Sequence, residues 1–118
     1  MEPINLAKKL DSIDGVWVPR TVATVNDYDV RVVKILGEFV RHQHEETDEM
    51  FLVLDGEMEI RMDEGSVWLR AGECYVVPAG VHHQPCAAQE TRVLLFEPSS
   101  VVNTGDAGGE LTQPRVEI

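Results

Sequence analysis

Residues 37–56 read GEFVRHQHEETDEMFLVLDG, and residues 72–85 read GECYVVPAGVHHQP. All four histidines of the chain lie in these two stretches, as His42-Gln43-His44 and His82-His83. A scarce residue type that occurs only beside other potential ligands indicates a chemical role. The pattern suggests a site for a single metal ion, to which both histidine clusters and a nearby carboxylate contribute.

The spacing within the first stretch suits a metal ion. Side chains at positions i and i+2 of a strand point to the same face, so His42 and His44 can both project inward and bind one ion. Glu49 is the predicted carboxylate ligand, because it directly precedes the apolar run 50–54 and is the acidic residue closest to the core. Neutral imidazole and carboxylate suit Fe, Mn, Ni, Zn or Cu better than Ca²⁺, which prefers oxygen ligands. The sequence therefore predicts one divalent transition metal per chain.

The same residues also have less specific interpretations. An isolated His-x-His pair can lie on an exposed strand by chance, and the acidic run 45–49 can be a solvated loop. Of His82 and His83, one is expected to bind and the other is not, and the pair alone does not say which. Cys86 is a further, weaker candidate ligand. The combination of His-x-His, a nearby carboxylate and a distant histidine is more specific than any one of these features.

Composition and charge limit the classes of protein that fit. With 118 residues the chain can bury one core but not two, and 43% hydrophobic with 26% charged residues is typical of a compact globular domain. A net charge of −11 argues against nucleic acid or an anionic membrane as a partner. No apolar run has the length of a transmembrane helix, and residues 1–10 lack the apolar segment of a signal peptide. The two cysteines are too few for a disulfide framework, so we expect reduced thiols in a cytoplasmic protein.

Residues with turn propensity divide the chain into short segments, mostly of β type. Residues 4–13 have an amphipathic helical pattern that ends before Gly15. After it, alternating or β-branched runs bounded by turn residues predict strands at 20–25, 28–36, 51–54, 57–62, 66–70, 74–77 and 91–97. Many short strands with tight turns are typical of a β-sandwich or barrel. Residues 99–110 have no strand pattern, and we expect either a flexible tail or an ordered arm that lies across the barrel mouth or a partner subunit.

The strand that follows Glu49 is apolar on both faces. If Glu49 faces inward, then Met50, Leu52 and Leu54 face outward. A strand that is apolar on both faces needs cover on both. A second sheet covers the inner face, and a partner subunit is a natural cover for the outer one. The sequence therefore predicts a homodimer.

The two histidine-containing stretches resemble the paired motifs of the cupin superfamily. The first family motif is roughly a glycine, a short spacer, His-x-His, three or four residues, a glutamate, six residues and a glycine. It is filled here by Gly37, His42, His44, Glu49 and Gly56. The second is roughly a glycine, five residues, Pro-x-Gly-x-x-His, three residues and an asparagine. It is filled here by Gly72, Pro78, Gly80 and His83, although Ala87 replaces the asparagine and the spacer after Gly37 is one residue short.

This resemblance implies an all-β fold, the cupin double-stranded β-helix or jelly-roll-type barrel, with a short N-terminal helix. We expect a single cupin domain over residues 1–118, with a barrel core at about 20–98 and a C-terminal arm or tail at 99–118. The resemblance also implies that the metal ligands are His42, His44, Glu49 and His83. Small cupins are often dimers, which agrees with the predicted homodimer.

The residues and the resemblance together suggest a metal-dependent enzyme that acts on a small organic molecule. Three imidazoles and one carboxylate leave positions open on a six-coordinate ion, where a substrate can bind. Dioxygenases, isomerases and lyases all occur among cupins, and the fold does not choose between them. The alternatives are a non-catalytic pocket that binds or senses a small molecule, and a barrel whose metal is purely structural.

Further site residues are less clearly indicated. The candidates for acid–base chemistry are Glu73, Tyr75 and His82. The residues expected to line the wall of the pocket are Phe51, Met62, Tyr75 and Phe96. Each of them is also a plausible residue of the barrel core or surface.

Overall fold

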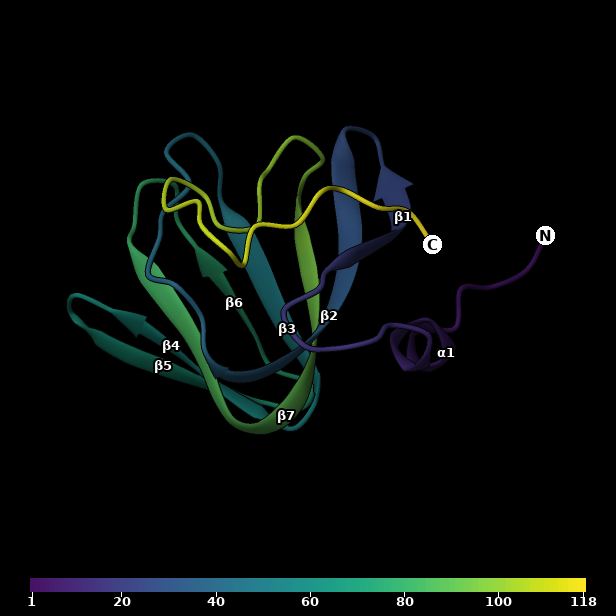
Figure 1. Cartoon of the computed structure of the whole chain (residues 1–118), viewed down its shortest axis with the longest axis horizontal. Coiled ribbons are helices and arrows are strands. Elements are labelled where there is room, and N and C mark those ends of the chain that lie inside the picture. Colours follow the sequence, from purple (N-terminus) through teal and green to yellow (C-terminus); the bar gives the residue numbers. More distant parts are fainter.

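The computed structural model describes residues 1–118 and consists of one short helix and a set of antiparallel strands (Figure 1). The elements are α1 (Leu6–Asp11), β1 (Arg20–Val25), β2 (Tyr28–Glu38), β3 (Glu49–Asp55), β4 (Glu57–Met62), β5 (Gly65–Arg70), β6 (Cys74–Val77) and β7 (His83–Pro98). The bounds predicted for β1, β4 and β6 are those observed, because turn or proline residues flank these strands. The prediction of an all-β fold with a short N-terminal helix is confirmed.

The helix α1 is shorter than the predicted residues 4–13. The side-chain oxygen of Asn5 caps its N-terminus by accepting a hydrogen bond from the backbone N–H of Lys8 at 3.0 Å. At the other end, the backbone N–H of Ser12 donates to the carbonyls of Lys8 and Lys9. Both ends are therefore set by caps that lie inside the predicted range.

The helical segment covers part of the outer face of the sheet. Leu10 and Ile13 form a buried cluster with Val32 of β2, and Leu54 of β3 packs against it. Leu54 is thus partly covered within its own chain. Like Met50 and Leu52, it stays half-buried, so cover by a partner subunit remains a prediction for this face of β3.

The long strand β7 joins the two halves of the barrel. Its residues 91–98 lie between β2 and β3, and its residues 83–87 pair with β4 and the end of β2. The predicted strand at 91–97 is too short. Residues 84–90 contain a proline and show no alternation, so the sequence does not predict a strand there. In the structure, neighbouring strands pair with much of the backbone of this segment. The strand order is β1-β2-β7-β3-β6, with the β4–β5 hairpin joined through β7. The sheet does not close, since β1, β5 and β6 each pair with a single strand.

The hydrophobic core fills the inside of the curled sheet. Val53, Met58 and Ile60 are almost fully buried, and buried residues alternate with more exposed ones along β3 and β4. This is the two-residue period that places alternate side chains on opposite faces. The same alternation puts Glu49, the first residue of β3, on the core side.

The C-terminal segment is ordered and crosses one end of the sheet toward β1 (Figure 1). The guanidinium of Arg31 donates to the carbonyls of Ser99 and Val101, at 3.0 and 2.9 Å. The backbone N–H of Thr21 donates to the carbonyl of Val116 at 2.8 Å. Of the two expectations for this region, the structure shows the ordered arm.

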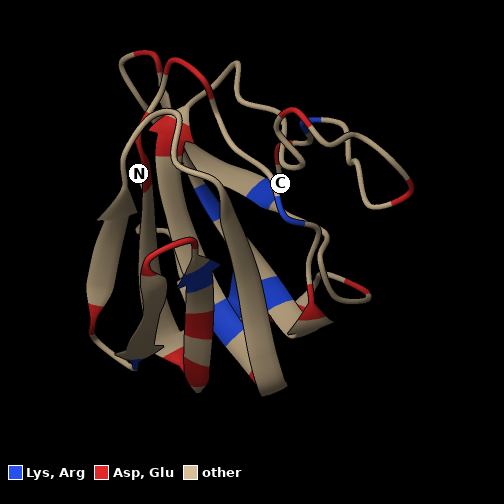
Figure 2. Ribbon diagram, turned by 90° about the vertical axis from the view of Figure 1, so that its left-hand side faces the viewer, with Lys and Arg blue, Asp and Glu red and all other residues tan.

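Charged residues are distributed unevenly over the molecule. Figure 2 shows Asp and Glu in several of the loops that connect the strands and also on some strands. No helix of the structure is both long enough and apolar enough to cross a membrane.

Candidate metal centre

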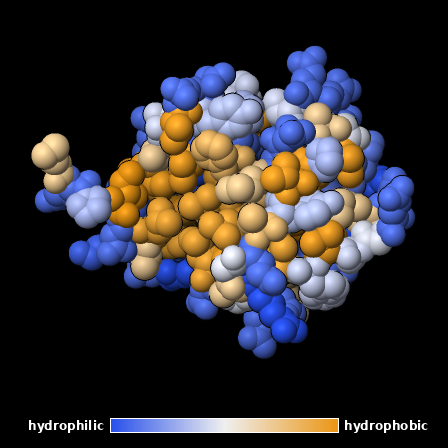
Figure 3. Space-filling model, turned by 180° about the vertical axis from the view of Figure 1, so that it is seen from behind, coloured by the Kyte–Doolittle hydropathy of each residue, from blue (hydrophilic) through white to orange (hydrophobic).

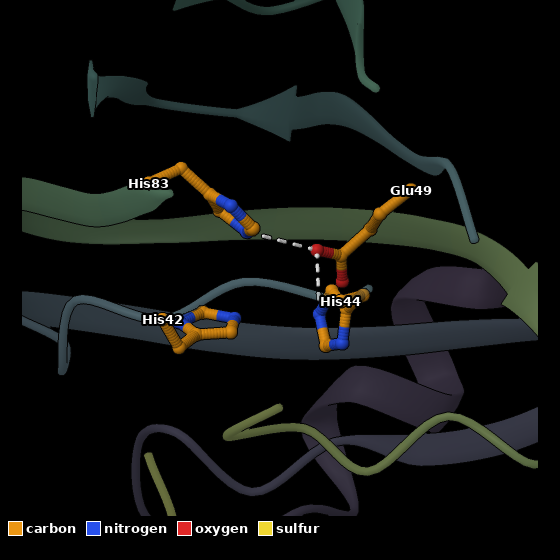
Figure 4. Close-up of side chains that lie close together, drawn as sticks. All are labelled: His42, His44, Glu49 and His83. Carbon is orange, nitrogen blue, oxygen red and sulfur yellow. Dashed lines mark hydrogen bonds and ion pairs between the residues drawn. The ribbon is translucent and has the colours of Figure 1, made fainter. Parts of the chain in front are cut away.

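Four buried side chains converge at one point inside the barrel (Figure 4). His42, His44, Glu49 and His83 each offer one nitrogen or carboxylate oxygen, and these atoms all lie within 4.8 Å of one another. The structure therefore brings together the four residues that the sequence analysis names as metal ligands, although His83 is distant from the others along the chain.

His42 and His83 are held side by side by their backbones. The N–H of each donates to the carbonyl of the other, at 3.0 and 2.8 Å. In each ring Nδ1 lies 2.9 Å from the carbonyl oxygen two residues earlier, which is Val40 for His42 and Val81 for His83. Because a carbonyl only accepts, Nδ1 carries the proton of the neutral ring, and Nε2 keeps its lone pair for a metal.

Glu49 links the imidazoles of His44 and His83. Its Oε1 lies 3.3 Å from His44 Nε2 and 3.2 Å from His83 Nε2. His44 Nε2 is nevertheless buried without a hydrogen-bond partner of acceptable geometry. Buried polar atoms of this kind are rare in folded proteins and call for an explanation. A metal ion bound among these atoms provides one.

The donor set and its spacing fit a divalent transition metal. Metal–ligand bonds of about 2.1 Å keep any two donors of one ion within about 4.2 Å of each other. The observed limit of 4.8 Å therefore requires only small side-chain shifts. Three imidazoles and one carboxylate match the ligand preference of Fe, Mn, Ni, Zn or Cu. The four buried residues could hold such an ion.

Burial and mutual contacts set the protonation of these ligands. Burial, followed by the neighbouring His83, lowers the pKa of His42 from 6.5 to about 4. Burial alone would raise the pKa of Glu49, but the close contacts of its carboxylate with His44 and His83 hold that pKa well below its usual range. At neutral pH His42 is therefore neutral and Glu49 is ionised, and these are the forms that bind a metal.

The weaker candidate ligands lie outside the cluster. The side chain of His82 is 42% exposed, and its Nε2 lies 3.8 Å from Asp106 Oδ2. Cys86 is buried, and its thiol donates to the carbonyl of Gln84 at 3.6 Å. Within the histidine pair, the geometry favours His83 over His82.

A small cavity of about 40 Å³ adjoins the cluster, with His42 and Glu49 among its lining residues. This is room for a few water molecules. Much of the remaining wall is apolar. It includes Trp17, Ile35, Phe39, Phe51, Met58 and Leu95. A ligand in this space would meet the candidate metal site and a mainly apolar wall.

Most of the predicted wall residues lie elsewhere. Phe51 lines the cavity, but Met62 and Tyr75 line a separate surface groove. Phe96 points to the outer face, where its ring stacks on Tyr28 with centroids 5.1 Å apart. The predictions for Met62, Tyr75 and Phe96 are wrong because sequence alternation does not show which faces and strand ends meet at the cavity. The exposed Glu73 does not line the cavity either.

Trp17 is a wall residue that the sequence did not reveal. Its φ of 62° lies in the left-handed region, which is uncommon for a residue other than glycine. The indole Nε1 donates to the carbonyl of Leu36 at 2.8 Å, and the ring stacks on Phe39 with centroids 4.7 Å apart. Because these contacts join distant segments, no local signal could have identified the residue.

A buried contact between an arginine and a glutamate also lies beside the site. Arg31 lines the cavity, and its Nη1 lies 3.6 Å from Glu97 Oε2. Burial, and next the charge of Glu49, raises the pKa of Glu97 well above its usual range. A sequence signal for Arg31 did exist, because the two-residue period places it on the same face as Val33 of the core.

Comparisons with known proteins identify relatives of this chain. Residues 30–97 match the family model described as Cupin domain. The Bacillus subtilis protein YdbB, which is uncharacterised, is 35% identical over 78 residues, covering 65% of this chain and 69% of that protein. The crystal structure of a cupin-2 domain containing protein from Shewanella frigidimarina is 42% identical with a TM-score of 0.79, over 80% of this chain and 93% of that one. A Neisseria meningitidis protein is 31% identical with a TM-score of 0.75, over 83% of this chain and 100% of that one.

Proposed function

Because this chain belongs to the cupin family, we propose that its buried cluster is a mononuclear metal site, with His42, His44, Glu49 and His83 as ligands of one divalent transition metal. We further propose that the protein is a metal-dependent enzyme that acts on a small organic molecule. In this proposal residues 1–118 form one cupin domain, whose barrel core spans about residues 20–98.

The observation that carries this proposal is the convergence of four buried donor atoms within 4.8 Å. His42 and His83 present Nε2 because backbone carbonyls hold their Nδ1 protons. Glu49 contributes a negative charge that partly offsets the positive charge of a metal ion. A bound metal would supply a Lewis-acidic centre with open coordination positions.

The cavity beside the cluster indicates a class of ligand. The one cationic side chain in its wall, Arg31, is already engaged by Asp29 and by the carbonyl of Val101. A strongly anionic molecule would therefore find no free positive side chain there. We infer a compact, neutral or weakly charged organic molecule that offers one oxygen or nitrogen to the metal and packs its apolar part against Phe39 and Phe51.

The alternative function is a non-catalytic cupin that binds or senses a small molecule. It is favoured by the absence of the acid–base candidates Glu73, Tyr75 and His82 from the cavity wall.

Elemental analysis of untagged protein tests the proposed metal site. We expect about one equivalent of Fe, Mn, Ni, Zn or Cu per chain, removed by a chelator and restored by the same ion. Conversion of a small organic substrate that stops on chelation would support the enzyme, whereas binding without conversion would support the alternative. Failure of all five ions to bind would contradict the metal site.

We expect the stability of the metal-free protein to fall as the pH drops from about 6.5 to 4. The pKa of His42 is about 4 in the folded state and about 6.5 in the unfolded chain, so only the unfolded chain binds this proton in that window. The contribution reaches about 1.4 kcal/mol per pH unit. Metal affinity should fall in the same direction, because protons compete for the imidazoles.

Denaturant unfolding at several pH values measures this contribution. Burial raises the pKa of Glu97, which acts in the opposite direction, so the measurement compares wild type with His42→Gln. His42→Gln should lose the part of the pH dependence of the unfolding free energy that comes from His42, and His82→Gln should keep it. Equal slopes for wild type and His42→Gln would contradict the prediction.

We also propose a homodimer through the outer face of the main sheet. On this face the strand register aligns Met50 with Phe96 and Val76, and Leu52 with Leu94. Figure 3 shows a broad hydrophobic surface on the side of the molecule from which the N-terminal segment extends. A contiguous apolar surface of this kind is typical of a protein interface, and a second copy can cover it symmetrically.

Leu52→Asp is expected to convert the dimer into a monomer, because it places a charge in the middle of the apolar face. Sedimentation velocity at micromolar concentration measures the change in mass. Trp68→Ala is a matched control, since Trp68 is 59% exposed on β5, which pairs only with β4. A wild-type protein that sediments as a monomer at high micromolar concentration would rule out the dimer.

A further inference from the structure

The two histidines of the His-x-His pair lie outside the regular strands. Between β2 and β3, His42 forms an isolated bridge with His83, and the carbonyl of His44 accepts a hydrogen bond from the N–H of Gly80 at 2.8 Å. Gln43, between them, has no strand partner for its own backbone. Gln43 links the two histidines, so the group that holds its backbone also affects the position of both imidazoles.

Asp106 of the C-terminal segment takes the place of that missing strand partner. Its Oδ1 accepts the backbone N–H of Gln43 at 2.9 Å, and its own N–H donates to the Gln43 carbonyl at 3.2 Å. Its Oδ2 accepts from Gln43 Nε2 at 3.3 Å. Both backbone groups of Gln43 are thus satisfied by one residue that lies far along the chain.

Gly105 brings the same segment against the ring of His42. A Cβ atom built on Gly105 would lie 2.3 Å from the carbonyl oxygen of Gln43 and 3.0 Å from His42 Cδ2. The φ of Gly105 is 53°, which also favours glycine. The backbone of the segment therefore packs directly on a candidate metal ligand, at a distance that no side chain allows.

Hydrogen bonds within the segment brace it, so it can act as a support. Thr104 is fully buried, and its hydroxyl lies 2.6 Å from that of Thr112. The side chain of Asn103 bonds to the carbonyl of Leu111 and the N–H of Gln113, both at 2.9 Å. Asn103 also lines the cavity beside the cluster.

We propose that Gly105 and Asp106 are positioning residues of the metal centre, which hold His42 and His44 in the geometry that binds the ion. The inference rests on the proposed metal site. It makes the C-terminal segment a functional part of that site, although no residue of the segment is a ligand. Supporting groups of this kind typically change metal affinity by about 10- to 100-fold.

The test compares metal affinity among variants of the full-length protein. Asp106→Ala should weaken Co²⁺ binding by about 10- to 100-fold in a chelator competition titration, and should change the visible absorption of the Co²⁺ that is bound. Gly105→Ala should act in the same direction. Asp106→Asn keeps an oxygen for the N–H of Gln43, so it should restore most of the affinity and the wild-type spectrum.

A matched control separates positioning from simple loss of charge. Glu110→Ala removes the same charge from an exposed residue of the same segment, and should bind Co²⁺ like wild type. The inference is overturned if Asp106→Ala and Gly105→Ala keep wild-type affinity and spectrum, or if Asp106→Asn is as weak as Asp106→Ala. Should Asp106→Ala fail to fold, Gly105→Ala and Asp106→Asn decide. A wild-type protein that binds no Co²⁺ or other metal removes the proposed site itself.

Discussion

Replacing His44 by alanine is expected to remove most metal binding, whereas replacing His82 should leave it nearly unchanged. His44 Nε2 is buried within the cluster and has no hydrogen-bond partner, while the side chain of His82 is 42% exposed and faces Asp106. Loss of one of the four proposed ligands should weaken the affinity by more than the roughly 10- to 100-fold that is typical of a lost supporting contact. Metal titration of the two variants measures the difference.

Thermal unfolding provides a second measure of the same effect. A metal that binds only the folded state stabilises it by about 2.7 kcal/mol at a hundredfold excess over Kd. For a domain of this size, this is on the order of 10 °C in Tm. Chelation should remove this metal-dependent rise in Tm without unfolding the barrel, because the apolar core around Val53, Met58 and Ile60 does not depend on the ion. His44→Ala should show almost no increment, and His82→Ala nearly all of it.

The outcome also decides the assignment within the histidine pair. His83→Ala is expected to behave like His44→Ala, since His83 is 1% exposed and belongs to the cluster. If His82→Ala loses the metal-dependent increment and His83→Ala keeps it, the assignment is reversed. If added metal changes the Tm of no variant and not that of wild type, the protein has no metal site of this kind.

Asp29→Ala is expected to destabilise the fold by about 3–5 kcal/mol, the cost of breaking a buried ion pair. Asp29 of β2 is fully buried. Its carboxylate accepts hydrogen bonds of 2.7–3.2 Å from Thr21, Arg31, Ser99 and Arg115. This one side chain therefore joins β1 and β2 to the C-terminal segment.

The size of the effect follows from what remains after the substitution. Without the carboxylate, the buried Arg31 keeps its carbonyl acceptors and a longer contact of 3.6 Å with Glu97. Asp29→Asn retains the shape and one acceptor, so its loss should be smaller. The exposed Asp14→Ala is the control, and should stay within about 0.5 kcal/mol of wild type. Denaturant unfolding at neutral pH measures all three, and a loss below about 1 kcal/mol for Asp29→Ala contradicts the role assigned to this residue.

The pH dependence of this contribution has a definite sign. Burial alone would raise the pKa of Asp29, but hydrogen bonds from Arg115, Ser99, Thr21 and Arg31 hold that pKa well below its usual range. Because the unfolded value is about 3.9, the stability from Asp29 is present at neutral pH and is lost only as the pH falls below about 4 toward the folded-state pKa.

Much of the fold could be predicted from short-range patterns. The bounds of β4 match the prediction because alternation runs from Glu57 to Met62 and turn residues flank it on both sides. The prediction for β7 was too short, because the segment around Pro85 carries no alternation and is a strand only through its pairing with β4 and β2. The path of residues 99–118 cannot be predicted from local patterns either, since it depends on contacts such as that of Arg115 with Asp29.

The candidate ligands could be predicted for a different reason. Imidazole and carboxylate groups at suitable spacing identify His42, His44 and Glu49, and the resemblance to the cupin motifs selects His83 over His82. The structure brings all four together. The spacing of the His-x-His pair predicts a regular strand at this position. In the structure His42 makes only an isolated bridge, and the neighbouring Gln43 is held by Asp106 instead.

Neighbouring residues are thus sufficient to predict most of the strands and the candidate ligands, because alternation, turns and ligand spacing are local properties. The pairing of His42 with His83, the entry of Trp17 into the cavity and the packing of Gly105 on His42 join segments that lie far apart in the chain. Such contacts form only when the burial of the whole core offsets the loss of chain entropy, so no single segment specifies them. The walls and the support of the site are therefore properties of the tertiary structure alone.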